Sequence, residues 1–367
     1  MEKGNTRNRY PLIELNLEKL RNNISQIVSR CNDAGVSITG VVKGFTGIPE
    51  GVKVFAEAGC DYIASSRLEQ IQGAIDYGIK ANYMLIRVPM LSEIEDVIRL
   101  TDISLNSEVE VLKALNKEAL KQGKTHKVIL MVDLGDLREG FWEKKELIDA
   151  AIMVENKLDS LHLAGIGTNL GCYGAIKATP EKMKSLIECA EMIERAIGRK
   201  LEIISGGATT SLPMILNGTM PSRINNLRVG EGIILARDLR DLYGLDMSYM
   251  FQDIFTLKAE IIEVKNKPSY PVGEFAFDAF RNTGVYEDLG IRKKAILGIG
   301  KVDIAYPDML CPRDEGVRIL GASSDHMIMD IEEAVRDFKV GDIIEFDLCY
   351  ATIVFATNSP NVRILCK

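Results

Sequence analysis

The stretch Ile38-Thr39-Gly40-Val41-Val42-Lys43 predicts a short buried strand that ends directly at a lysine. Its aliphatic residues are β-branched, and such residues favour strands. Seven similar runs follow, separated by segments of helical period: Tyr62–Ser65, Tyr83–Ile86, Ile103–Leu105, Lys127–Val132, Leu161–Ile166, Leu201–Ser205 and Ile224–Val229. Strands that alternate with helices indicate βαβ units around a parallel sheet. Eight repeats predict a closed (β/α)8 TIM barrel, and an open doubly wound sheet is the alternative.

The pattern changes after Met250, where helical segments become rare. Six strand-like segments follow: Phe255–Val264, Lys294–Ile299, Val317–Leu320, Met327–Ile331, Ile343–Leu348 and Ile353–Ala356. Turn residues such as Asn266-Lys267-Pro268 separate them. We therefore expect an α/β protein with a barrel over residues 10–245 and a mainly-β domain over residues 246–367. A strand within residues 10–16 is expected to pack with the second domain.

The composition is that of a globular protein, because 46% of the residues are hydrophobic and 26% are charged. The net charge of −7 argues against a nucleic-acid partner, since phosphate-backbone binding depends on clustered Lys and Arg. The seven cysteines are dispersed and odd in number, which indicates reduced thiols. No apolar run approaches the roughly 20 residues that span a bilayer. We expect a soluble cytoplasmic protein without a membrane partner.

Metal and dinucleotide sites have little support. The histidines, His126, His162 and His326, are far apart and form no HxH or HxxxH pair. Gly165-Ile166-Gly167 and Gly298-Ile299-Gly300 do not continue as GxGxxG. We therefore predict no metal site and no Rossmann site.

Active sites of barrel enzymes lie at the C-terminal ends of the strands. The residues that close the eight runs are unusually polar: Lys43, Ser65 and Ser66, Arg87, Asn106, Asp133, Thr168 and Asn169, Ser205 to Gly207, and Arg228 to Gly230. Lys43 is the most informative, because burial lowers the pKa of a lysine and so prepares its amine to attack an aldehyde. A lysine with its amine in solvent is the alternative for this residue taken alone.

The loops after the last two predicted strands are rich in glycine and hydroxyl groups. Such loops often hold a phosphate in barrels, because backbone N–H groups converge there. The candidates are Ser205, Gly207, Thr209, Thr210 and Gly230. Two ordinary glycine-rich turns are an equally good interpretation of these loops alone.

Several segments together resemble the alanine racemase family of fold type III pyridoxal-phosphate enzymes, over nearly the whole chain. Val41-Val42-Lys43-Gly44 is similar to the cofactor-lysine segment, and Asp133 to Gly140 is similar to the DxGxxRxG segment. Asn226 to Gly232 resembles the RxG segment, and Val340-Gly341-Asp342 the late VGD turn. Their joint order and spacing carry the resemblance.

The resemblance implies that Lys43 carries pyridoxal 5′-phosphate as a Schiff base and is one catalytic base. It implies that Arg228 faces the pyridine nitrogen, and that Arg138 positions the substrate carboxylate and the phenolic oxygen of the cofactor. Asn169 and Tyr350 are further expected cofactor contacts. The resemblance also implies a homodimer whose active sites are completed across the interface.

The chain departs from the family at its second base. Lys301 stands where the family has a tyrosine, and Ser323-Ser324-Asp325 replaces a Cys-Met-Asp segment. These departures resemble the ornithine racemase branch, with Gly321 to His326 as its GASSDH-like segment.

We therefore expect a racemase that removes the Cα proton of a basic amino acid such as ornithine. The second base is His326 or Lys301, and His326 is favoured because an imidazole titrates near neutral pH. Ser324, Asp325 and Asp303 are expected substrate contacts, the two carboxylates for the terminal ammonium. The alternatives are a lyase similar to D-threonine aldolase, an alanine racemase, and a non-catalytic pyridoxal-phosphate-binding homeostasis protein.

Overall fold

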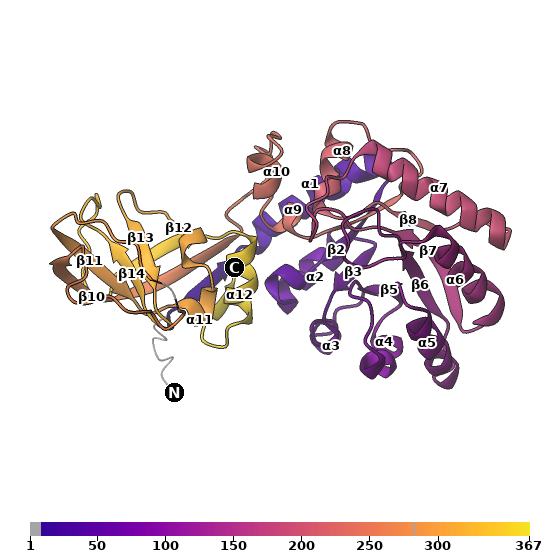
Figure 1. The fold of residues 1–367 in the computed structure, drawn as a ribbon, viewed down its shortest axis with the longest axis horizontal. Helices are drawn as coiled ribbons and strands as arrows, with labels where there is room; N and C mark the ends of the chain where they lie inside the picture. Colours follow the sequence, from indigo (N-terminus) through magenta and orange to yellow (C-terminus); the bar gives the residue numbers. More distant parts are fainter. Residues whose placement is uncertain (1–8, 282) are drawn as a thin grey trace. The chain divides into compact units, whose positions relative to one another are not determined.

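The computed structural model describes residues 9–281 and 283–367, which form two compact units. One unit spans Leu17–Gln252, and the other combines residues 9–16 with Asp253–Lys367. Both are drawn as ribbons in Figure 1.

The first unit is a closed barrel of eight parallel strands, which confirms the predicted TIM barrel over the open-sheet alternative. The strands occur around the barrel in chain order, and β9 closes it by pairing with β2. Their bounds are β2 (Ser37–Val41), β3 (Tyr62–Ser65), β4 (Tyr83–Leu85), β5 (Ile103–Asn106), β6 (His126–Met131), β7 (Leu161–Gly167), β8 (Ile203–Ser205) and β9 (Asn226–Val229).

Helices surround the ring of strands (Figure 1). They are α1 (Leu17–Asp33), α2 (Pro49–Glu57), α3 (Leu68–Asp76), α4 (Ile94–Leu100), α5 (Val109–Lys121), α6 (Lys144–Lys157), α7 (Pro180–Ile197), α8 (Leu212–Leu216), α9 (Glu231–Ile234) and α10 (Arg237–Asp241). The barrel interior is filled by apolar side chains from successive strands, including Val41, Ala64, Met84, Leu105 and Ile129. It is a packed core, as in other barrels of this size, and only the strand ends can form a site.

The second unit is built on a mainly antiparallel sheet with strand order β12-β15-β10-β11-β14-β13. The early strand β1 pairs antiparallel with β10 and parallel with β16, and so belongs to this sheet. The strands are β1 (Leu12–Leu15), β10 (Phe255–Pro268), β11 (Ile291–Leu297), β12 (Cys311–Pro312), β13 (Arg318–Ala322), β14 (Met327–Asp330), β15 (Ile343–Asp347) and β16 (Arg363–Cys366).

Two short helices, α11 (Lys301–Ile304) and α12 (Tyr350–Asn358), accompany this sheet. The prediction of a strand at Ile353–Ala356 is wrong, because these residues lie inside α12. The helix begins where the Cys349 N–H donates to the Thr352 hydroxyl oxygen at 2.9 Å. A uniformly apolar run has no period that separates helix from strand, so the capping contact was the missing signal.

The division between the units differs from the predicted boundary at residues 245/246. The segment after α10 remains with the barrel because it packs on α1. The Asn23 amide donates to the Phe251 carbonyl at 2.7 Å and accepts from the Phe251 N–H at 2.9 Å. The Arg30 guanidinium also lies 3.7 Å from the ring centre of Tyr249.

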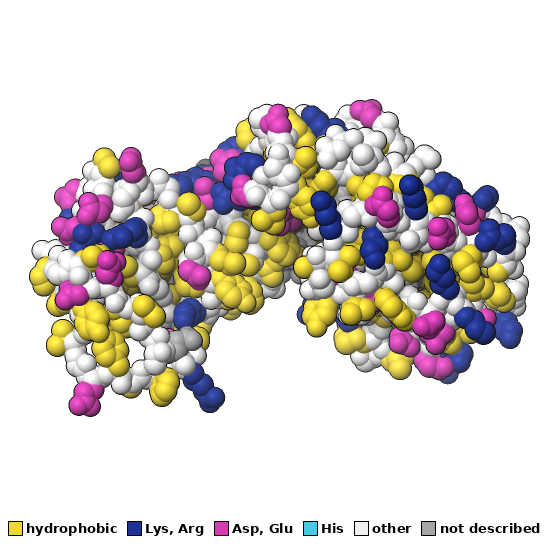
Figure 2. Space-filling model, turned by 45° about the horizontal axis from the view of Figure 1, so that its top comes forward, with side chains coloured by type: hydrophobic (Ala, Val, Ile, Leu, Met, Phe, Trp, Pro, Cys, Tyr) yellow, Lys and Arg dark blue, Asp and Glu magenta, His cyan; other side chains and the backbone are white. Residues whose placement is uncertain are grey.

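Acidic and basic side chains are interspersed over the face shown in Figure 2. Within the part of the chain that the structure describes, no helix combines the length and apolar character needed to cross a membrane.

Candidate active site

Lys43 lies two residues after the end of β2 and begins a 3-10 turn, Lys43–Phe45. Its side chain is half-buried, and its amine has no hydrogen-bond or ion-pair partner among residues 9–281 and 283–367. Burial lowers the pKa of Lys43, and the nearby Arg138 and Arg228 guanidinium groups lower it further, while Cys172 and Glu139 oppose the change. An unpartnered amine with a lowered pKa is the state a nucleophilic lysine requires.

Arg228 lies on β9 and is only 3% exposed. Its guanidinium donates to the Ser205 hydroxyl oxygen, to the Thr168 carbonyl at 2.7 Å and to the Asn169 side-chain oxygen at 2.7 Å. Burial lowers the pKa of Arg228 to about 10, so the group stays charged at neutral pH. The barrel therefore holds a fixed cation on its last strand, β9, which pairs with β2, the strand that precedes Lys43.

Arg138 and Glu139 lie in the loop after β6. The Glu139 carboxylate accepts from Nε of Arg138 and, at 2.7 Å, from its Nη2. Asn169 then donates its amide N–H to the same carboxylate. Arg138, Glu139, Asn169 and Arg228 thus form one connected group of side chains, which we call the arginine network.

The loop that carries Arg138 is held by its own carboxylates. Asp133 accepts the N–H groups of Gly135 at 2.8 Å and Leu137 at 3.1 Å. Gly140 has φ +135°, and a Cβ there would lie 2.5 Å from the Asp133 nitrogen, so only glycine fits.

A second carboxylate ties this loop to the loop after β7. Asp136 is 1% exposed and accepts four backbone N–H groups, from Gly171, Cys172, Tyr173 and Ile176. Burial tends to raise the pKa of Asp136, but the four hydrogen bonds outweigh it and lower that pKa. These hydrogen bonds join the two loops that carry Arg138, Glu139 and Asn169 of the arginine network.

The two glycine-rich loops that are predicted to hold a phosphate contact each other. The Thr209 hydroxyl oxygen accepts from the Gly232 N–H at 3.0 Å, which joins the loop after β8 to the loop after β9. Gly207 has φ +109°, and a Cβ at Gly230 would contact the Val41 carbonyl oxygen at 3.2 Å. The loop after β9 therefore borders the strand that leads to Lys43, and the loop after β8 is joined to it.

Two of the predicted phosphate donors need correction. The Ser205 hydroxyl is fully buried and donates to the Asn226 side-chain oxygen at 2.6 Å, so it supports Arg228 instead. The Thr210 hydroxyl donates to the Leu170 carbonyl at 2.8 Å. Since a hydroxyl has a single proton to donate, the candidate donors that remain are the Thr209 hydroxyl and the backbone N–H groups.

The remaining predicted residues belong to the second unit, where several come together. The Lys301 and Val302 N–H groups donate to the carbonyls of Ser323 at 2.9 Å and Ser324 at 3.1 Å. A Cβ at Gly300 would lie 2.1 Å from the Ser324 carbonyl oxygen. The segment before α11 is therefore pressed against the Ser323–His326 turn, which we call the Ser-Asp-His turn.

The side chains of this cluster are accessible. His326 and Asp325 are exposed, and the Ser324 hydroxyl donates to the Asp325 carboxylate at 2.8 Å. The Lys301 amine lies 4.2 Å from the ring centre of Phe280, close enough for a cation–π contact. Tyr350 begins α12 in the same unit, and its cofactor contact stays a prediction.

The prediction that Asp303 binds a substrate ammonium is corrected. Asp303 is 4% exposed, and its carboxylate accepts from the Ser359 hydroxyl at 2.7 Å and the Asn361 amide at 3.2 Å. It also accepts from the Gly300 N–H at 3.3 Å. Asp303 joins α11 to the segment after α12 and is closed to a ligand.

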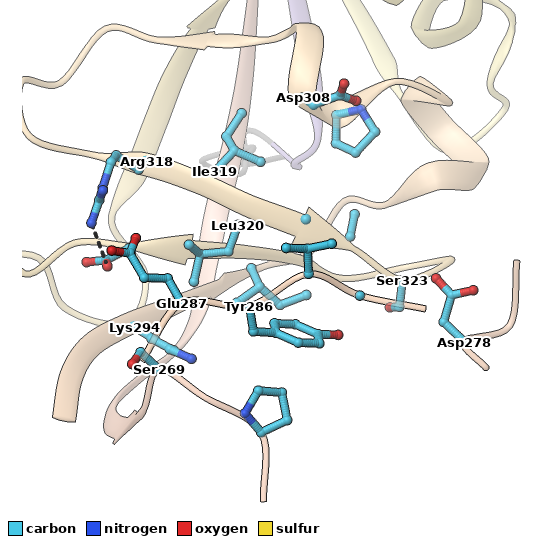
Figure 3. A pocket seen from close by; sticks show the side chains of 18 of the residues that line it. Ser269, Asp278, Tyr286, Glu287, Lys294, Asp308, Arg318, Ile319, Leu320 and Ser323 are labelled. Carbon is cyan, nitrogen blue, oxygen red and sulfur yellow. Dashed lines mark hydrogen bonds and ion pairs between the residues drawn. The ribbon is translucent and has the colours of Figure 1, made fainter. Parts of the chain in front are cut away.

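An open cavity of about 870 Å³ lies beside Lys301 and Ser323 in the second unit. In Figure 3, Ile319 and Leu320 of β13 and the ring of Tyr286 line it, with Ser323 and Asp278 at one end. Sequence reasoning did not find this cavity, nor the roles of Glu139 and Cys172 near Lys43. The position of Glu139 inside the DxGxxRxG segment, next to Arg138, was the sequence signal that could have indicated its role.

A closed barrel with a lysine after its first strand and a buried arginine on its last, followed by an antiparallel β unit, defines the class of barrel-type pyridoxal-phosphate enzymes. The chain belongs to the alanine racemase family, because residues 15–238 match the model of the alanine racemase N-terminal domain.

Two curated relatives cover almost the whole chain. An ornithine racemase of Acetoanaerobium sticklandii is 43% identical over 96% of this chain and 99% of its own length. A lysine racemase of Thermotoga maritima is 36% identical over 96% of this chain and 98% of its own. The alanine racemase structure from Streptomyces lavendulae has a TM-score of 0.76 at 15% identity and covers 98% of both chains, a similarity of fold.

The chain is thus a pyridoxal-phosphate-dependent amino-acid racemase. The barrel residues fit this cofactor. Among the described residues the Lys43 amine has no competing hydrogen-bond or ion-pair partner, Arg228 is a buried cation, and the loop of Gly230 adjoins the strand before Lys43.

Proposed function

We propose that this racemase acts on a basic amino acid, with ornithine as the favoured substrate. The observation that carries the proposal is the packing of Lys301 against the Ser-Asp-His turn, in place of a tyrosine and a Cys-Met-Asp segment. The ornithine and lysine racemases named above support it, since both match nearly the full chain.

The bound cofactor would withdraw electrons from the substrate Cα and so acidify its proton. In the proposed site, Lys43 accepts or returns that proton on one face of Cα. Arg138 would bind the substrate carboxylate, and Arg228 would hold the pyridine nitrogen of the cofactor. Since the pKa of Arg228 remains near 10, its guanidinium gives up no proton to the ring at neutral pH.

The opposite face of Cα requires a second proton carrier, for which we propose His326, with Lys301 as the alternative. His326 is exposed, whereas the Lys301 amine lies over the Phe280 ring. Of the two carboxylates predicted for the terminal ammonium of ornithine, Asp325 remains, because Asp303 is occupied. Ser324 orients Asp325 through their hydrogen bond.

We further propose a homodimer in which the second unit of one subunit completes the barrel site of its partner. The arrangement expected for the family supports this, because the candidates for the two proton carriers lie in separate units. A cytoplasmic location is proposed from the cysteines, none of which is joined in a disulfide.

The test is a panel of single L-amino acids incubated with the purified holoenzyme, followed by chromatographic resolution of the enantiomers. We expect ornithine or lysine to racemise at least tenfold faster than alanine, a discrimination of about 1.4 kcal/mol. Preference for alanine, or cleavage of D-threonine without racemisation, would overturn the proposal. A Lys43→Ala variant prepared in parallel controls for contaminating racemases.

A further inference from the structure

We propose that Glu139 is a positioning residue, which orients Arg138 for the substrate carboxylate and couples it to Arg228 through Asn169. This inference rests on the proposed function, because it assigns Arg138 to substrate binding. Its evidence is the geometry of the arginine network within the barrel unit.

One edge of the Arg138 guanidinium is already occupied. Glu139 accepts from Nε and Nη2 of Arg138, so the carboxylate lies along one side of the guanidinium. A guanidinium has five N–H donors in a planar fork. The Nη1 side therefore remains for a second carboxylate, and the orientation of the pair decides where that carboxylate can bind.

The pair is adjacent in sequence, which makes its geometry a property of the loop. The flanking residues Leu137 and Gly140 have φ of +53° and +135°. These left-handed conformations bend the chain on either side of the two residues. The side chain of Glu139 is 17% exposed and that of Arg138 is 38% exposed, so water screens the pair less than it would at an open surface.

Asn169 links the Arg138–Glu139 pair to Arg228. The Asn169 amide donates to Glu139 through Nδ2 and accepts from Arg228 through Oδ1 at 2.7 Å. Both ends of the amide are thereby used, and its orientation is defined. Arg138, which is expected to contact the substrate, is therefore connected through Glu139 and Asn169 to Arg228, the cation expected at the pyridine nitrogen.

Glu139 also acts on the charge balance around Lys43. Lys43, Arg138 and Arg228 place three cationic groups in one region, and Glu139 is the carboxylate among the charges that act on Lys43. Cys172 is the other group that acts in the same direction as Glu139. Glu139 therefore opposes the two arginines, which lower the pKa of Lys43.

The loop does not depend on Glu139 for its fold. Asp133 accepts N–H groups of the loop's own backbone, and Asp136 ties the loop to the one after β7. The Lys182 amine also donates to the Leu134 carbonyl at 2.6 Å. Glu139→Gln keeps the size of the side chain and removes its charge, so the variant is expected to fold.

The experiment is a double-mutant cycle on the holoenzyme with Glu139→Gln, Arg138→Ala and both together, assayed with L-ornithine. If Glu139 acts through Arg138, Glu139→Gln raises KM about tenfold with a smaller change in kcat, and has less than a twofold effect in the Arg138→Ala background. An equal effect in both backgrounds, or an unchanged KM, would overturn the proposal. Glu143→Gln, an exposed glutamate nearby, is the matched control.

A second readout does not require racemisation. The absorbance of the bound cofactor is titrated against pH in the wild type, Glu139→Gln and Glu143→Gln. Loss of a carboxylate that favours the protonated Lys43 nitrogen should move the midpoint to lower pH in Glu139→Gln alone. An unmoved midpoint contradicts the inference, whereas a wild type that fails to racemise ornithine contradicts the proposed function and leaves this titration valid.

Discussion

The Nη2 atom of Arg228 lies 2.7 Å from the side-chain oxygen of Asn169, and the amide nitrogen of Asn169 contacts the Glu139 carboxylate. A residue of β9 and residues of the loops after β6 and β7 therefore meet in one hydrogen-bonded group. The link between Arg228 and Glu139 therefore depends on Asn169, an uncharged residue.

Replacing Asn169 by alanine should disconnect Arg228 from Glu139. The loss leaves a buried guanidinium N–H without its acceptor, which costs about 1–3 kcal/mol of stability. We expect a lower melting temperature together with at least a tenfold fall in kcat/KM. Asn217→Ala, at an exposed asparagine, is the control for the substitution itself. A fully active and fully stable Asn169→Ala variant would show that the link has no role.

Replacing Lys43 by alanine should remove racemisation and covalent cofactor binding together, because this amine has a lowered pKa and no hydrogen-bond or ion-pair partner in the described part of the chain. We expect activity to fall by more than about a thousandfold. The check is the visible absorbance of the purified variant before and after borohydride. Borohydride-reducible absorbance retained by Lys43→Ala would assign the cofactor to another lysine.

Replacing His326 by glutamine should impair proton exchange on one face of Cα only, because Lys43 would still serve the other face. In deuterated water we expect one ornithine enantiomer to lose Cα exchange while the other retains it. Lys301→Gln, assayed in the same way, distinguishes the two candidates. If only Lys301→Gln gives the one-sided loss, the second base is Lys301 and the assignment to His326 is wrong.

Replacing Asp303 by alanine should weaken the second unit without changing recognition of the substrate side chain. Its carboxylate accepts three hydrogen bonds in a buried position, so the expected loss is about 1–3 kcal/mol of unfolding free energy. Denaturant unfolding measures the loss, and KM for ornithine should change less than twofold. A large rise in KM at unchanged stability would restore Asp303 as a substrate contact.

Glu231 should make the stability of the protein depend on pH. Burial raises the pKa of Glu231 to about 7, and its Oε2 atom has no hydrogen-bond partner in the described chain. Between the unfolded pKa near 4.5 and the folded pKa, the native state binds more protons than the unfolded state. The contribution of Glu231 to the free energy of unfolding therefore falls as the pH rises, and it levels off above about pH 7.

Glu231→Gln removes that contribution and keeps an oxygen for the Arg237 and Asp238 N–H groups. The free energy of unfolding of the variant minus that of the wild type should therefore increase by roughly 3 kcal/mol from pH 5 to pH 8. Denaturant unfolding at both pH values is the measurement, with Glu143→Gln as the exposed control. The same stability difference at both pH values would show that Glu231 does not titrate in this range.

The sequence by itself determined the barrel and the position of its lysine. A parallel sheet buried on both faces produces continuous apolar runs, and these located strands such as Tyr62–Ser65 within a residue or two. The lysine after the first run could be recognised because a charged residue at a buried strand end is unusual. These signals are local, since they depend on neighbours in the chain.

Only the tertiary structure decided which polar residues meet and which are already occupied. Glu139 and Asn169, on different loops, become partners because parallel strands bring their C-terminal ends to one rim of the barrel. Asp303 has a carboxylate of the kind that binds an ammonium group, yet hydrogen bonds from Ser359 and Asn361 already occupy that carboxylate. A hydrogen-bond partner distant in sequence leaves no periodic pattern, so these outcomes depend on the folded positions of the loops.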